Sequence, residues 1–262
     1  MGVLDSLGWP PPTEWAGASA GSAMCLIAST GRTDTSLQRF VEATRLNRKN
    51  IYPINAVLPW RKVFPHEAIY RAVLAHALDG PGWESLRQAS PVHTFLAYVR
   101  PGEPVARSVL GAVRSYQRRS KQNILHGEST LPRGIETETV TLQTLQSPQR
   151  VVDTVISSSA TWPVTGLPRV AGCTYIDSAA VDGLPVRALS PSARRGKILI
   201  FLSTPVDPAK LPSNPNRMYL APEVEPAISM WDYASPEKVL ETFERGQREG
   251  RRWSKRILDF IG

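Results

Sequence analysis

The sequence is poor in cysteine and has no long apolar run. Its 262 residues include two cysteines, Cys25 and Cys173, which are too few for a disulfide framework or a cysteine-built zinc site. The richest apolar runs, residues 23–28 and 198–202, are far shorter than the ~18 residues of a membrane-spanning helix. The first residues carry no secretory signal pattern, and the chain has no Asn-x-Ser/Thr sequon. These absences lead us to expect a cytoplasmic protein.

Histidine is also scarce, and none follows residue 127. The chain contains His66, His76, His93 and His126. An α/β-hydrolase triad runs in the order serine, acid, histidine and therefore needs a late histidine, which this sequence does not supply. Ordinary surface or packed positions are the favoured interpretation of all four, so a serine enzyme built on this chain would need another base.

The chain is basic, with 31 Lys and Arg against 23 Asp and Glu and a formal net charge of +8. No nucleic-acid-binding motif accompanies this charge and the aromatic residues are not interleaved with the basic runs, so we expect no nucleic acid partner. At the C-terminal end, Glu244 and Glu249 alternate with six Lys and Arg residues, which indicates pairing along a helix.

Residues 105–122 predict a basic amphipathic helix. One face carries Arg107, Arg114, Arg118 and Lys121 with Arg119 beside them, and the other carries Val105, Val109, Leu110, Val113 and Tyr116. Such a helix is able to lie on an anionic membrane surface, which would give the protein a peripheral membrane contact. The alternative is the solvated face of an ordinary packed helix.

Apolar periodicity predicts alternating helices and strands. Helices are expected over residues 20–30, 37–44, 66–78, 105–122, 148–156 and 236–257, and a helix end over residues 2–7. Strands are expected over residues 94–99, 139–145, 174–176, 197–203 and 218–220. The runs 95–99 and 198–202 are apolar throughout, which is typical of strands covered on both faces. We therefore expect one α/β domain over residues 1–262, a three-layer α/β/α arrangement around a mainly parallel sheet.

The sharpest local signal is a G-x-S-x-G pattern at residues 17–21. It reads Gly17, Ala18, Ser19, Ala20 and Gly21. This pattern suits a nucleophile elbow, a very tight strand-to-helix turn that lifts the serine oxygen clear of the sheet. Glycines two before and two after the serine would remove side chains that collide in the turn. The alternative is a helix that begins with small residues and packs closely against a strand.

Three further blocks follow in a characteristic order. Residues 158–163 read S-S-A-x-x-P, residues 175–177 read Tyr-Ile-Asp, and residues 181–186 read Val-Asp-Gly-Leu-Pro-Val. Together with the elbow, these blocks resemble the patatin-like phospholipase family, serine hydrolases that use a Ser–Asp dyad and no histidine. The resemblance implies a patatin-like fold with Ser19 as nucleophile and Asp177 as its partner. It also implies an acyl lipid ester as substrate, and neither a metal nor an organic cofactor.

The sequence departs from the family pattern in three places. The glycine that follows the dyad aspartate in the family is Ser178 here, which would be strained by roughly 1–2 kcal/mol at a positive φ. The asparagine expected before Leu-Pro is Gly183. The sixteen residues before Gly17 hold no Gly-rich oxyanion loop, so we expect the family's first strand and that loop to be missing from this chain. Two explanations are open: the sequence is shortened at its start, or the protein is a diverged member of the family. The competing interpretation of function is then a catalytically impaired relative that binds acyl lipid or a protein partner.

Without that loop, an oxyanion would depend on the Ala20 N–H and the dipole of the following helix. Each missing donor costs about 3 kcal/mol of transition-state stabilisation. We therefore predict that the 262-residue chain reacts slowly with a fluorophosphonate probe at Ser19, measured by mass spectrometry of the labelled peptide. Labelling at the speed of an ordinary serine hydrolase would refute this prediction.

Overall fold

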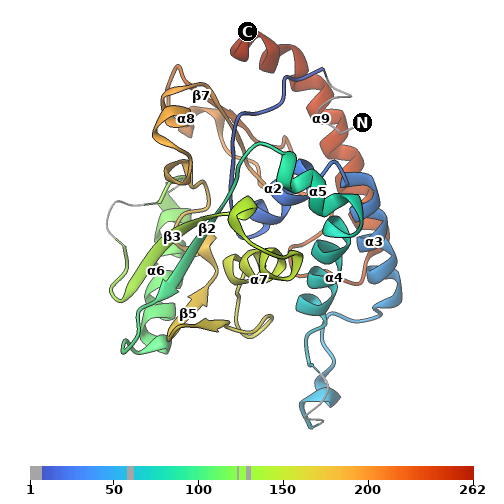
Figure 1. Cartoon of the computed structure of the whole chain (residues 1–262), viewed down its shortest axis with the longest axis vertical. Helices are drawn as coiled ribbons and strands as arrows, with labels where there is room; N and C mark the ends of the chain where they lie inside the picture. Colours follow the sequence, from blue (N-terminus) through green and yellow to red (C-terminus); the bar gives the residue numbers. More distant parts are fainter. Residues whose placement is uncertain (1–7, 58–61, 123, 128–130) are drawn as a thin grey trace. The chain divides into compact units, whose positions relative to one another are not determined.

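The computed structural model describes residues 8–57, 62–122, 124–127 and 131–262, and Figure 1 follows the chain through its helices and strands. The chain divides into two compact units. Unit 1 comprises Met1–Pro11, Thr33–Val73 and Pro191–Gly262, and unit 2 comprises Pro12–Arg32 and Leu74–Ser190. The helix end predicted at residues 2–7 lies outside the described residues, and the single domain expected from the sequence stays a prediction.

Unit 2 is organised around the strand β2 (Val92–Val99), which pairs along both of its edges. The first half of β2 lies parallel to β1 (Trp15–Ala18), with Trp15 opposite Val92. Its second half pairs antiparallel with β5 (Cys173–Ile176), which in turn pairs with the short β4 (Arg169–Val170). The other edge of β2 is covered by β3 (Ile135–Thr141), again antiparallel. The strand that crosses the middle of the sheet is therefore the buried apolar run that the sequence predicts.

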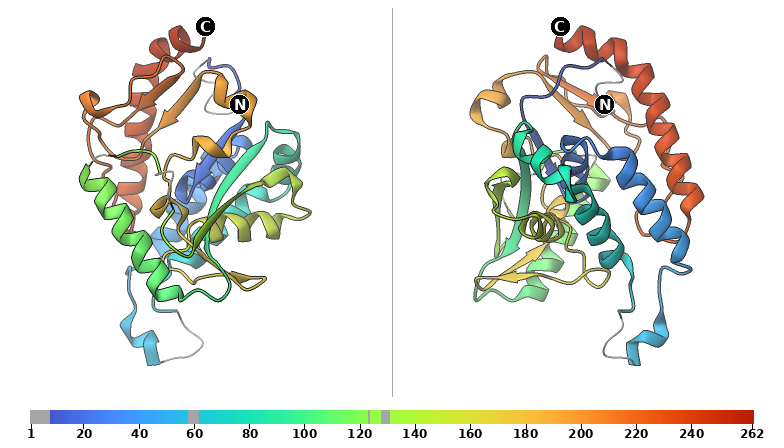
Figure 2. Two further views of the ribbon diagram at one scale, coloured as in Figure 1. Left: turned by 90° about the vertical axis from the view of Figure 1, so that its left-hand side faces the viewer. Right: turned by 45° about the vertical axis from the view of Figure 1, so that its right-hand side comes forward.

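Helices cover both faces of this sheet (Figures 1 and 2). Helix α6 (Val105–Gln122) packs on the face that presents Ala97 and Val99, where the apolar cluster also includes Ala112 and Ile176. Helices α2 (Ala20–Ser29) and α7 (Pro148–Ser158) contact β2 from the opposite face, and α5 (Pro81–Gln88) packs against α2. Unit 2 thus has the predicted three-layer α/β/α arrangement.

The prediction of a mainly parallel sheet is wrong, because the sheet is mixed. In the described part of the chain, β1 with β2 is its one parallel pairing. The alternation of helices and strands in the sequence does not fix strand direction. The connection from Arg100 to Gly134 returns the chain to the end of β2 that it left, so that Ile135 lies opposite Val99.

Unit 1 contains the long helix α9 (Pro236–Ile261), helix α3 (Thr33–Leu46), the short α8 (Pro191–Arg195) and a two-stranded parallel sheet of β6 (Ile198–Phe201) and β7 (Arg217–Leu220). Its core gathers Trp9, Met218, Leu220 and Ile257. The predicted strand at 198–202 is therefore present, but it is not part of the central sheet, and Phe201 is half exposed. Its apolar character reflects packing within this smaller core rather than cover on both faces.

The remaining predicted elements lie close to their expected positions. Helix α4 (His66–Leu78) and helix α6 have the predicted bounds, while α3 and α9 extend beyond theirs. The strand expected at 139–145 begins earlier, at Ile135, and ends at Thr141. No helix of the described residues is both long enough and apolar enough to cross a membrane.

Candidate active site

Ser19 occupies a strained turn between a strand and a helix. Strand β1 ends at Ala18, helix α2 begins at Ala20, and Ser19 between them has φ 52° and ψ −126°. Positive φ is disfavoured for a residue with a side chain and costs about 1–3 kcal/mol, so the surrounding structure must hold it. This is the backbone geometry that a nucleophile elbow requires.

Gly17 is needed because the helix approaches it closely. A Cβ at Gly17 would lie 2.4 Å from the carbonyl carbon of Gly21 and 2.5 Å from the Ser22 nitrogen. The expectation that a side chain at Gly21 would also collide in the turn is wrong, since a Cβ there meets no atom of the described residues within 4 Å. The crowding falls on Gly17 alone, because it is the backbone of Gly21 that occupies the space beside it.

Asp177 reaches Ser19 from the end of β5, which pairs with β2 next to β1. Strand β5 ends at Ile176, and Asp177 caps the short 3₁₀ helix η3 (Ser178–Ala180), with its Oδ1 accepting a hydrogen bond from the Ala179 N–H at 2.8 Å. The Ser19 hydroxyl donates to Asp177 Oδ2 at 2.9 Å, although the two residues are 158 positions apart in the sequence. The two side chains that the resemblance selects are thus in direct contact.

A second hydroxyl approaches the same carboxylate oxygen. Thr161 Oγ1 donates to Asp177 Oδ2 at 2.9 Å. Burial raises the pKa of the Asp177 carboxyl above its ordinary value, and the hydrogen bonds from Ser19, Thr161 and the backbone oppose this rise without cancelling it. A carboxylate with a raised pKa is a stronger base, which brings it closer to the requirements of proton abstraction from a serine hydroxyl.

Three serine hydroxyls with no exposed surface support the elbow from below. Ser158 Oγ donates to the Phe95 carbonyl of β2 at 2.8 Å and accepts the Ser19 N–H at 2.8 Å. Ser178 Oγ accepts the same N–H at 3.1 Å, and Ser22 Oγ donates to the Gly17 carbonyl at 2.8 Å. Because the Ser19 N–H is already shared between two hydroxyls, the strained residue is tied both to the central strand and to the loop of Asp177.

Ser178 therefore does not carry the strain considered from the sequence. Ser19 and Ala171 are the described non-glycine residues with positive φ, and Ser178 is not among them. It lies fully buried in η3, where its hydroxyl contacts Ser19 and Ser158. Sequence reasoning missed the roles of Ser158, Ser178 and Thr161 because a hydroxyl gives no sign in the sequence of which distant backbone group it binds.

The histidines and the second aspartate of the matched blocks lie elsewhere. His66 bonds to the Trp231 carbonyl and His93 to Thr141, so both have structural partners. Asp182 is buried and accepts from the backbone of Gly127 and Leu184. It fixes a loop and does not contact the dyad.

The described residues contain no group of three His, Cys, Asp or Glu side chains placed to hold a metal ion. What the site does contain is a serine hydroxyl, a buried carboxylate and the beginning of a helix. Helix N-terminal N–H groups and the helix dipole favour negative charge. A nucleophile, a base and N–H donors are the groups that acyl transfer uses.

A strand-to-helix turn with a strained serine, set in a layered α/β unit, is the arrangement of the hydrolases with a nucleophile elbow. A family model for patatin-like phospholipases matches residues 1–190. The chain therefore belongs to the patatin-like phospholipase family, a family of acyl hydrolases that act on lipids. Among curated proteins, none matches the chain.

The hydroxyl network predicts an unequal effect of two neighbouring serines. Ser158→Ala removes the closer acceptor of the Ser19 N–H and leaves the Phe95 carbonyl without its donor, at a cost of about 1–3 kcal/mol in the free energy of unfolding. We expect ester turnover to fall with it, mainly in kcat. Ser157→Ala is the matched control, because its hydroxyl donates only to Asp153 on its own helix. Equal effects of the two substitutions on stability and turnover would contradict this account.

The environment of Asp177 predicts a pH dependence. The carboxylate must be ionised to accept a proton, so turnover should fall on acidification through a pKa that lies above the ordinary aspartate value of 3.8. Thr161→Val removes a hydrogen bond that favours the ionised form, so the acidic limb of the pH–rate profile should move to higher pH. Thr154→Val, which removes a hydroxyl bonded to the Arg150 carbonyl on α7, is the control and should leave the limb in place. A downward shift in Thr161→Val would reject the assignment.

Proposed function

We propose that this chain hydrolyses acyl ester bonds of lipids with Ser19 as nucleophile and Asp177 as general base. The observation that carries the proposal is the 2.9 Å hydrogen bond from the Ser19 hydroxyl to Asp177, made at a strained strand-to-helix turn. Membership of a lipid acyl hydrolase family supports the substrate class. The ordered contact matters because a preformed hydrogen bond places the base where the proton leaves.

The dyad operates in two steps. Asp177 takes the proton of Ser19 as Oγ attacks the ester carbonyl carbon, and the resulting tetrahedral intermediate collapses as Asp177 returns the proton to the leaving alcohol. An acyl group then remains on Ser19. In the second step Asp177 takes a proton from water, the hydroxide attacks the acyl carbon, and the proton returns to Ser19 Oγ as the fatty acid leaves.

The oxyanion of each intermediate needs donors near Ser19. The N–H of Ser19 is unsuitable because the hydroxyls of Ser158 and Ser178 already accept it. We assign the role to the N–H of Ala20, the first residue of α2, together with the positive end of that helix. Gly17 and Gly21 shape the backbone of this site, because the close approach of Gly21 to Gly17 fixes the turn at Ser19.

An exposed aromatic residue beside the dyad suits a lipid. Trp162 directly follows Thr161, the residue that bonds to Asp177, and 70% of its surface is exposed. Large exposed aromatic side chains favour the boundary between water and apolar chains. We propose that the protein is cytoplasmic, that it reaches its substrate by peripheral contact with an anionic membrane, and that nucleic acid is not a partner.

Paired substitutions at the dyad test the function. Ser19→Ala and Asp177→Asn should each lower turnover of a short-chain nitrophenyl ester and of vesicle phospholipid by at least about a hundredfold, because each removes a group from the bond-making step. Fluorophosphonate labelling should disappear in Ser19→Ala. Turnover that survives in Ser19→Ala would remove this serine from the mechanism. A wild-type chain that is folded and inactive would instead support the impaired relative.

Thermal unfolding of Asp177→Asn separates lost chemistry from lost folding. The folded-state pKa of Asp177 is raised, so this group stabilises the fold at low pH and the contribution is lost as pH rises from 3.8 through the folded value. At neutral pH the buried, ionised carboxylate therefore destabilises the fold. Asp177→Asn should melt at the wild-type temperature or above it.

A further inference from the structure

Helix α6 presents a basic surface that the proposed mechanism does not use. Arg107, Arg114, Arg118 and Lys121 are exposed on it, and the helix contains no acidic residue. Arg119, which the sequence places beside these residues, does not belong to this surface, because its side chain is buried. The exposed face of α6 is thus cationic along its length.

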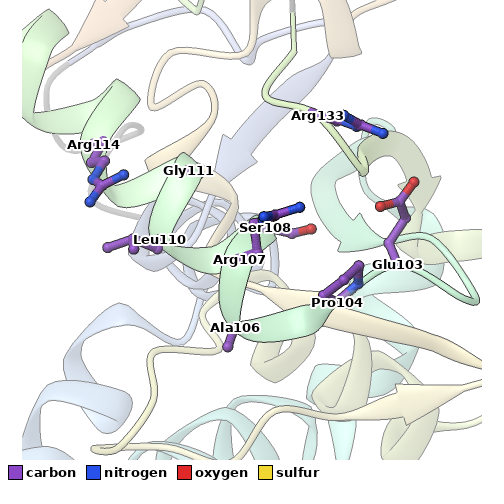
Figure 3. Close-up of a pocket in the computed structure, with 9 residues that line it drawn as sticks. All are labelled: Glu103, Pro104, Ala106, Arg107, Ser108, Leu110, Gly111, Arg114 and Arg133. Carbon is purple, nitrogen blue, oxygen red and sulfur yellow. The ribbon is translucent and has the colours of Figure 1, made fainter.

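A hollow opens beside the first half of α6. It measures about 660 Å³ and lies between α6 and the segment that carries Arg133. Figure 3 shows Arg107 and Arg114 on the same helix, Leu110 between them, and Arg133 across from the helix. Glu103 is the acidic residue of the lining, and it is within 3.6 Å of Arg100, which offsets its charge. The hollow is therefore lined by an excess of positive charge.

Among the described residues, the guanidiniums of this hollow have no carboxylate partner. Within the described ranges, no acidic side chain lies within ion-pair distance of Arg107, Arg114 or Arg133. Helix α9 is equally rich in arginine but differs in this respect. Arg248 pairs with Glu244 along the helix, as the alternation in the sequence predicts. Arg245 pairs with Glu241 one turn earlier, and Arg252 pairs with Glu223 outside the helix. Part of the charge on α9 is thus neutralised locally, and charge around the hollow is available to an anion.

Apolar side chains are exposed on the same helix. Leu110, Val113 and Tyr116 of the predicted apolar face are 47%, 40% and 48% exposed. Val105 and Val109 do pack against the core cluster below α6. A surface that combines exposed arginines with exposed aliphatic and aromatic groups matches a lipid headgroup layer, with phosphates above and acyl chains below. A nucleic acid backbone would use the cations but leave Leu110 and Val113 in water.

We propose that α6 and Arg133 form the surface by which unit 2 docks onto an anionic phospholipid bilayer. Arg107, Arg114 and Arg133 receive lipid phosphates at the hollow, and Leu110, Val113 and Tyr116 enter the headgroup boundary. This inference rests on the proposed function for its purpose, since docking brings a lipid hydrolase to its substrate. The binding itself needs no turnover.

One buried side chain of α6 connects the proposed docking surface to the loop that follows Asp177. The guanidinium of Arg119 donates to the backbone carbonyls of Ala180 and Val181, three and four residues after Asp177. Helix α6 also packs against η3, whose N-terminal cap is Asp177. The helix that meets the bilayer is thereby fixed to the loop that carries the proposed base.

Vesicle co-sedimentation tests the surface. The full chain with Ser19→Ala is mixed with phosphatidylcholine vesicles, with or without phosphatidylglycerol, so that no lipid is consumed. We expect binding to the anionic vesicles and its loss at high salt. Arg107→Glu with Arg114→Glu should weaken partitioning by at least about tenfold, since each basic residue near the surface contributes attraction. Leu110→Ser should weaken it by about threefold at unchanged charge, because less apolar surface is buried.

The matched control reverses two exposed charges on α9, with Arg251→Glu and Lys255→Glu, and should leave partitioning within about twofold of the parent, as expected for charges outside the surface. Circular dichroism and melting temperature confirm that each variant folds. Equal losses from the α6 and α9 pairs would overturn the proposal, as would equal binding to neutral vesicles. Binding of a single-stranded oligonucleotide in place of vesicles would also overturn it. Soluble-ester turnover by protein with Ser19 intact reports on the proposed function separately.

Discussion

The hydroxyl of Ser158 is the interaction on which the site depends. It bonds to the central strand through the Phe95 carbonyl, to the elbow through the Ser19 N–H, and to the aspartate loop through Ser178. One buried hydroxyl group therefore joins three segments that are distant in the sequence. A site built in this way keeps its geometry only while every member of the network has its partner, because an unsatisfied buried polar group is costly.

This network explains how a disfavoured backbone conformation persists at Ser19. A positive φ costs about 1–3 kcal/mol, and a buried hydrogen bond contributes about 1 kcal/mol. The bonds to Ser158 and Ser178, with Ser22 anchoring Gly17, are of the size needed to offset the strain. The strained turn places the Ser19 hydroxyl within hydrogen-bond distance of Asp177, and the buried charge of Asp177 adds a second local cost. The strained turn and the buried charge thus lower the free energy of unfolding, and packing of the surrounding core offsets this loss.

Sequence reasoning was most successful where a short pattern corresponds to a single local conformation. Residues 17–21 predict the elbow, and the periodicity of residues 105–122 predicts α6 with its bounds. It failed where the outcome depends on tertiary contacts. Strand direction in the sheet and the separate pairing of 198–201 both follow from which surfaces meet, which a periodicity does not specify. The contact between Ser19 and Asp177 was reached by resemblance, since no spacing rule joins residues 158 positions apart.

The order of the segments in the two units has a consequence for synthesis on the ribosome. Trp9 donates a hydrogen bond to Ser254 of α9, so the core of unit 1 closes only when nearly the whole chain has been made. The segments of unit 2 end at Ser190, well before α9 emerges. Domains generally fold as units during translation. Some 160 further residues must therefore be made after Ser19 before Asp177 is available to it, and Trp9 meets its partner on α9 later still.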